Sequence, residues 1–111
     1  MANPSKQKGT KAETAVVEYL KPTWKAVERR ALTGSQDKGD ISGVPNVCLE
    51  VKNHKTIKLS EWVDQLETEI KNSKSTTGAV IHKRAGKVDV GKWYATMPVY
   101  VLVDLLKKAG Y

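Results

Sequence analysis

The chain has 111 residues, with 19 Lys and Arg against 12 Asp and Glu, so its formal net charge is +7. This length suits one domain, and a hydrophobic content of 40% suffices for a core. The sequence has no run of about eighteen apolar residues and no apolar leader, so we expect a soluble, cytoplasmic protein without a membrane partner. The single cysteine excludes an internal disulfide and a cysteine-rich zinc site. The positive charge favours a polyanionic partner such as nucleic acid.

The N-terminal third is expected to contain an arm, a helix and a strand. Residues 1–9 are polar and basic, which predicts a flexible arm, and residues 10–111 are expected to form one domain. Thr10 and Glu13 fit a capping box, so a helix is expected from Thr10 until Pro22 interrupts it. Residues 24–32 alternate loosely and predict a strand, which a turn-rich loop follows.

The middle of the chain contains its clearest strand. A short strand is expected at 40–44 and a longer one at 47–53. In the second strand, Val47, Leu49 and Val51 point to one face, and Glu50 and Lys52 therefore share the other.

The remaining elements complete a mixed fold. An amphipathic helix is expected at 59–70, strands at 78–84 and 92–97, and a last helix from Pro98. The order αβββαββα predicts a single α/β domain with a central mixed β-sheet flanked by helices.

Carboxylates and a lysine on two adjoining strands suggest a metal site. Asp40, if its strand lies beside that of Glu50, can place a second carboxylate on the same ion, and the Val51 carbonyl can supply a third ligand. Magnesium prefers such hard oxygen ligands. Lys52 would then orient or deprotonate a water, or stabilise charge on a phosphate, as phosphodiester hydrolysis requires.

Two further acids each have two interpretations. Glu13 lies with apolar residues on one stripe of its helix, so it can reach the sheet and bear on the metal, or it can simply close the capping box with Thr10. Asp37 competes with Asp40 as a ligand, but its place before Gly39 favours a turn-forming role.

The motifs together resemble the PD-(D/E)xK nuclease superfamily, and most closely the archaeal-type and phage Holliday junction resolvases. The pattern is Glu13, then GD at 39–40, then EVK at 50–52, within a likeness that runs from about residue 9 to residue 78. The resemblance implies a restriction-endonuclease-like fold, metal ligation by Asp40 and Glu50, and a catalytic role for Lys52. Glu13 would match the helical acid of the superfamily. One departure is Gly39, which replaces the proline of the superfamily's name.

The resemblance also implies two supporting residues and a substrate. Ser35 would match a loop serine near the active site, and Gln65 a glutamine that supports it. The protein would be a Mg²⁺-dependent endonuclease, with Mn²⁺ as a substitute and no small-molecule cofactor, acting on DNA four-way junctions. Its location would be the cytoplasm, or the host cytoplasm if a phage encodes it.

Basic residues near the motifs are candidates for DNA contacts, although adjacent charges are also common on solvated surfaces. They are Arg29, Arg30, Lys38, His54 and Lys55. The last helix is apolar nearly all round, so either a second copy covers it in a homodimer that matches the two-fold symmetry of a junction, or its own sheet covers it.

Two rival functions stay open on the sequence alone. One is a different nuclease of the same superfamily that acts on flaps, ends or single strands. The other is a non-catalytic nucleic-acid-binding module in which the carboxylates are solvated surface.

Overall fold

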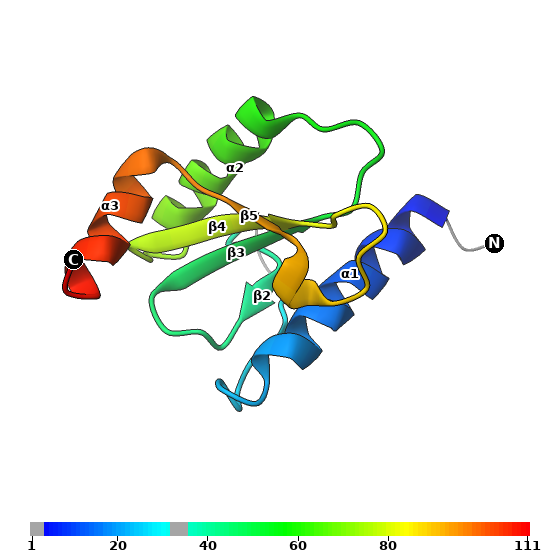
Figure 1. Cartoon of the computed structure of the whole chain (residues 1–111), viewed down its shortest axis with the longest axis horizontal. Helices are drawn as coiled ribbons and strands as arrows, with labels where there is room; N and C mark the ends of the chain where they lie inside the picture. Colours follow the sequence, from blue (N-terminus) through cyan, green and yellow to red (C-terminus); the bar gives the residue numbers. More distant parts are fainter. Residues whose placement is uncertain (1–3, 32–35) are drawn as a thin grey trace.

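The computed structural model describes residues 4–31 and 36–111, so the predicted role of Ser35 lies outside the described residues. Figure 1 shows the elements of this part of the chain. They are α1 (Pro4–Leu20), β1 (Glu28–Arg29), β2 (Ile41–Ser42), β3 (Val47–Lys52), α2 (Leu59–Asn72), β4 (Thr77–His82), the 3-10 helix η1 (Val90–Lys92), β5 (Tyr94–Thr96) and α3 (Val99–Lys108). None of these helices has both the length and the apolar character that a membrane span requires.

The sheet has five strands in the spatial order β1-β2-β3-β4-β5. β3 and β4 are parallel, and α2 connects them, as a parallel pair requires a crossover. The other neighbouring pairs are antiparallel. The expected α/β domain with a central mixed sheet and flanking helices is therefore confirmed.

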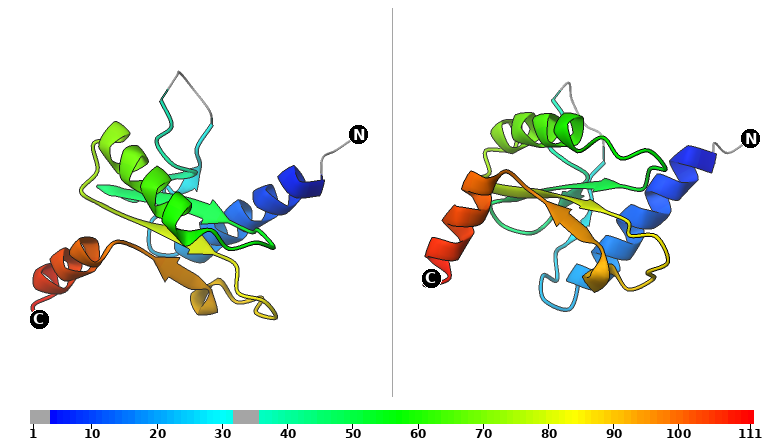
Figure 2. Two further views of the ribbon diagram at one scale, coloured as in Figure 1. Left: turned by 90° about the horizontal axis from the view of Figure 1, so that it is seen from above. Right: turned by 45° about the horizontal axis from the view of Figure 1, so that its top comes forward.

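Helices cover the two faces of the sheet. α1 and α2 lie on opposite sides of it (Figures 1 and 2). On the α1 side, Val16 packs with Leu49 and Val51 of β3. On the α2 side, Trp62 and Leu66 pack on the strands. β3 is thus buried on both faces, and its expected alternation is confirmed.

Three predictions for the N-terminal third of the chain are wrong in whole or in part. α1 begins at Pro4, so residues 4–9 are helical and do not form an arm. Pro4 suits the first turn of a helix, because its missing N–H would have no partner there. Thr10 and Glu13 consequently lie inside α1, and no capping box forms between them. The expected strand at 24–32 is reduced to β1, since a turn bond from the Val27 N–H to the Trp24 carbonyl precedes it.

The last helix is not covered by its own sheet. In α3 only Val101 is buried. Val99 is 75% exposed and Tyr100 61% exposed, and α3 lies at one end of the molecule (Figure 2). The sheet-covered alternative is therefore wrong, and the apolar surface of α3 is free among the described residues.

Candidate functional site

The predicted pair on β3 is close in space. Glu50 is 2% exposed, and its Oε2 lies 3.5 Å from the Lys52 Nζ. Gln65, from α2, accepts a hydrogen bond from the same Nζ at 3.0 Å. Two side chains, Glu50 of β3 and Gln65 of α2, thus hold the Lys52 ammonium in position.

Asp40 lies against β3, immediately before β2. Its backbone N–H donates to the Leu49 carbonyl at 2.9 Å, and its Oδ2 accepts from the Val51 N–H at 2.8 Å. The N–H and C=O of one strand residue point the same way, so the Val51 carbonyl also points toward the Asp40 side. The structure therefore brings together the expected two carboxylates, the backbone carbonyl and the lysine.

Gly39 has a backbone conformation that proline cannot adopt. Its φ is +98°, in the region that favours glycine, whereas the proline ring fixes φ near −65°. A Cβ at this position would lie 2.9 Å from the Cys48 Sγ and 3.1 Å from the Leu49 carbonyl oxygen. The glycine lets the chain pass close to β3 and brings Asp40 to it.

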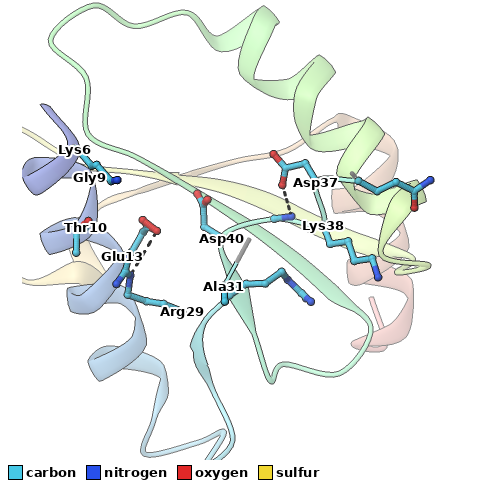
Figure 3. A pocket seen from close by; sticks show the side chains of 12 residues that line it. Lys6, Gly9, Thr10, Glu13, Arg29, Ala31, Asp37, Lys38 and Asp40 are labelled. Carbon is cyan, nitrogen blue, oxygen red and sulfur yellow. Dashed lines mark hydrogen bonds and ion pairs between the residues drawn. The ribbon is translucent and has the colours of Figure 1, made fainter. Parts of the chain in front are cut away.

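Glu13 faces the same cleft as Asp40, and its observed partner is an arginine. Its Oε1 is 3.7 Å from the Arg29 Nε, and both residues line a cleft of about 540 Å³ that also contains Asp40 (Figure 3). The compact group of three acids found among the described residues includes neither Glu13 nor Asp40. The contribution of Glu13 to a metal site stays a prediction, and Arg29 is its observed partner.

A fully buried glutamate of α2 was missed by the sequence reasoning. Glu69 is 0% exposed, and it forms with Asp37 and Glu50 a group whose carboxylate oxygens all lie within 4.8 Å of one another. Its spacing from Trp62 and Leu66 on the buried stripe of α2 was the available signal.

Asp37 combines its predicted turn role with a place in this group. Its Oδ1 accepts a hydrogen bond from the Gly39 N–H at 2.9 Å, so the turn-forming interpretation is confirmed. The loop that Asp37 anchors also contacts α2, because Asn72 donates to the Asp37 carbonyl at 2.9 Å.

Burial dominates the electrostatics of these acids. Burial and then the neighbouring Glu69 raise the pKa of Glu50 to about 10. Burial raises the pKa of Glu69 to about 7, with Asp37 adding to the rise. The pKa values of Asp40 and Glu13 are also raised, again chiefly by burial. Without a cation, the two buried glutamates can bond each other only by sharing a proton.

The carboxylates fit a divalent ion. The Oε1 of Glu50 is buried and has no hydrogen-bond partner within the described part of the chain. A buried carboxyl oxygen of this kind is normally hydrogen-bonded, paired with a charge or bound to a metal. Asp40, Glu50 and the Val51 carbonyl supply the hard oxygen donors that Mg²⁺ or Mn²⁺ prefers.

The candidate DNA contacts fall into two groups around the site. Arg29, Arg30 and Lys38 line the cleft that contains Asp40. His54 and Lys55 line a second cleft of about 520 Å³, together with the site lysine. Burial, and then the nearby lysines, lower the pKa of His54, so it contributes little charge at neutral pH.

No family model, curated protein or solved structure matches this chain. The resemblance to the PD-(D/E)xK superfamily consequently depends on the motif residues, and the roles that it implies stay predictions.

Proposed function

We propose that the protein is a divalent-metal-dependent endonuclease that hydrolyses DNA phosphodiester bonds, with four-way junctions as its substrate. One observation carries the proposal. Glu50 and Lys52 meet Asp40 at one point of the sheet, and Gln65 holds the lysine there at 3.0 Å. A solvated surface has no reason to bury a glutamate beside a positioned lysine, which disfavours a pure binding module.

Asp40, Glu50 and the Val51 carbonyl would hold the ion. When bound, such an ion activates water as a nucleophile and stabilises the growing charge on a phosphate. Lys52 is the group of this chain that would act on the reacting atoms. Its ammonium can donate to the attacking water or to a phosphate oxygen, while the Glu50 carboxylate and Gln65 keep its Nζ in place.

The charges around the site suit a phosphate backbone. Basic residues line the cleft that contains Asp40 and the cleft that contains Lys52. Contacts of this kind are independent of base sequence, so recognition would depend on the shape of the branched DNA. Affinity should accordingly fall as salt increases.

The exposed surface of α3 supports a homodimer. Its apolar side chains would lose contact with water if a second copy covered them, and two active sites related by a two-fold axis suit the paired cuts of a junction. The exposed apolar side chains of α3 include Val99, Tyr100, Leu102, Val103 and Leu106, each more than 40% exposed.

A cleavage assay tests the proposed function. Labelled four-way junction, linear duplex, flap and single-stranded DNA are incubated with the protein in Mg²⁺ or in EDTA, beside Asp40→Asn. We expect paired symmetric nicks on the junction alone, abolished by EDTA and reduced about a thousandfold by Asp40→Asn, since a ligand carboxylate supports several kcal/mol of charge stabilisation. Cutting of flaps or ends instead of the junction would support the nuclease activity but contradict the four-way junction as its substrate. Binding without cutting, unchanged by EDTA and by Asp40→Asn, would contradict the nuclease.

A further inference from the structure

A second group of acids lies beside the Asp40 carboxylate. Asp37 comes from the loop before β2, Glu50 from β3 and Glu69 from α2. One carboxylate oxygen of each lies within 4.8 Å of the other two. Three carboxyl groups from three separate segments therefore converge on one small volume, where their mutual repulsion would oppose folding if all three were ionised.

The buried members of this group lack donors. Glu69 is 0% exposed, and neither of its carboxylate oxygens has a hydrogen-bond partner in the part of the chain that the structure describes. The same holds for the Oε1 of Glu50. The Lys52 ammonium lies beside Glu50, but its Nζ contacts the other carboxyl oxygen of that residue, Oε2. Buried acceptors without donors are rare in folded proteins, because each loses its bonds to water.

A shared proton satisfies this group only in part. One proton between Glu50 and Glu69 engages two of the three buried oxygens and leaves the third without a donor. A divalent cation can contact all three side chains at once. Ligand oxygens on one ion lie at most twice the ion–oxygen distance apart, about 4–5 Å for Mg²⁺ or Ca²⁺, which agrees with the observed spacing.

An ion also has a way in. Asp37 is exposed and lines the cleft that contains Asp40, so the group opens to solvent on its side. The Asp37 Oδ1 is engaged by the Gly39 N–H, which orients the carboxylate and leaves Oδ2 for a ligand contact. A hard ion such as Mg²⁺ would complete its coordination with water from the cleft.

We propose that Asp37, Glu50 and Glu69 bind a second divalent cation, with Glu50 shared between this ion and the one held by Asp40 and the Val51 carbonyl. The inference deepens the proposed function, because Glu50 belongs to both sites. Its test is a binding measurement, so it does not depend on cleavage being observed.

The experiment is a titration of the full chain with Mn²⁺. Calorimetry measures the heat of binding, and the electron paramagnetic resonance signal of free Mn²⁺ measures how much ion stays unbound. Wild type, Glu69→Gln, Asp37→Asn, Asp40→Asn and Glu67→Gln are compared. Glu67→Gln is the matched control, because it removes the same charge from the same helix at an exposed position and leaves an amide oxygen that can still accept from the Tyr100 hydroxyl. We expect two ions per chain in wild type and Glu67→Gln, and one in Glu69→Gln. In Asp37→Asn the amide oxygen can still accept from the Gly39 N–H, so the loop should keep its conformation. This variant should lower the affinity for the second ion at least tenfold. It also provides an independent test if Glu69→Gln does not fold.

The outcomes separate this inference from the proposed function. Stoichiometry and affinity that are identical in wild type, Glu69→Gln and Asp37→Asn would overturn the second site, even if the protein cleaves DNA. An ion lost in Glu69→Gln but retained in Asp40→Asn would support the site, even if no DNA is cleaved. If Glu69→Gln unfolds, unchanged binding in Asp37→Asn alone overturns the proposal.

Discussion

The two faces of the sheet differ in what they bury. The α1 face is an apolar cluster, in which Val16 is fully buried against Leu49 and Val51. The α2 face packs Trp62 and Leu66 on the same strands, but it also buries charged or polar groups. They are Glu50, Glu69 and His82, each at most 5% exposed. β3 contributes alternate residues to both faces, so one strand serves both stability and the candidate site.

This difference separates two physical roles. Apolar burial on the α1 face stabilises the fold in proportion to the area removed from water. Buried acids on the α2 face oppose folding unless a proton or a cation neutralises them. Function and stability are therefore expected to respond to different changes on the two sides of one sheet.

The largest expected effect falls on the α2 face. Lys52→Ala should lower the rate of DNA cleavage by about a hundredfold to ten-thousandfold, because it removes the group that would donate a proton or stabilise charge at the reacting phosphate. The first-order rate of junction cleavage at saturating Mg²⁺ measures this. Lys21→Ala, an exposed lysine after α1, is the control. Equal rates for Lys52→Ala and wild type would remove the lysine from the mechanism.

A change on the α1 face should affect stability alone. Val16→Ala removes two buried methyl groups and should lower the free energy of unfolding by about 2 kcal/mol. Denaturant unfolding checks this, with and without Mg²⁺. The cleavage rate per folded molecule should stay at the wild-type value. A selective loss of cleavage in a fully folded sample would show that the two faces are coupled more tightly than we infer.

The smallest expected effect is a pH dependence of the metal-free protein. The pKa values of Glu50, about 10, and Glu69, about 7, lie above those of unfolded glutamate, so the folded chain binds more protons above about pH 4.5. Stability from these groups is complete at acid pH and is lost as pH rises. In EDTA the unfolding temperature should therefore fall by several degrees between about pH 5 and pH 8.

The matched variants sharpen this test. Glu69→Gln should flatten the slope, since it removes one titrating group, whereas Glu67→Gln should retain it. Saturating Mg²⁺ should also reduce the slope in wild type, because the ion replaces the protons. A metal-free protein whose unfolding temperature rises over the same range would contradict the assigned pKa shifts.

The sequence predicted the parts of the site that depend on local periodicity. The alternation of β3 placed Glu50 and Lys52 on one face, and the neighbouring strand brought Asp40 to them. The class of fold followed from the order of helices and strands. Local signals were enough here, because period-two alternation along one strand fixes which side chains share a face.

The rest depended on packing that local signals do not encode. Glu69 joins the site because α2 crosses the sheet at a particular position, which the amphipathic pattern of α2 does not specify. The Thr10 and Glu13 spacing matched a cap by composition, while the helix extended back to Pro4. The exposure of α3 could not be read from its apolar sequence, since a buried helix has the same composition.

One measurement tests the central claim, that the buried acids of the α2 face form a nuclease centre. It is the rate of Mg²⁺-dependent cleavage of a labelled four-way junction by wild type, Glu50→Gln and Glu67→Gln, in samples of equal folded fraction. We predict that Glu50→Gln loses at least about a thousandfold in rate, since it removes a ligand carboxylate, and that Glu67→Gln cleaves like wild type. Equal rates for Glu50→Gln and wild type, or no cleavage by wild type of any DNA tested, would contradict the account.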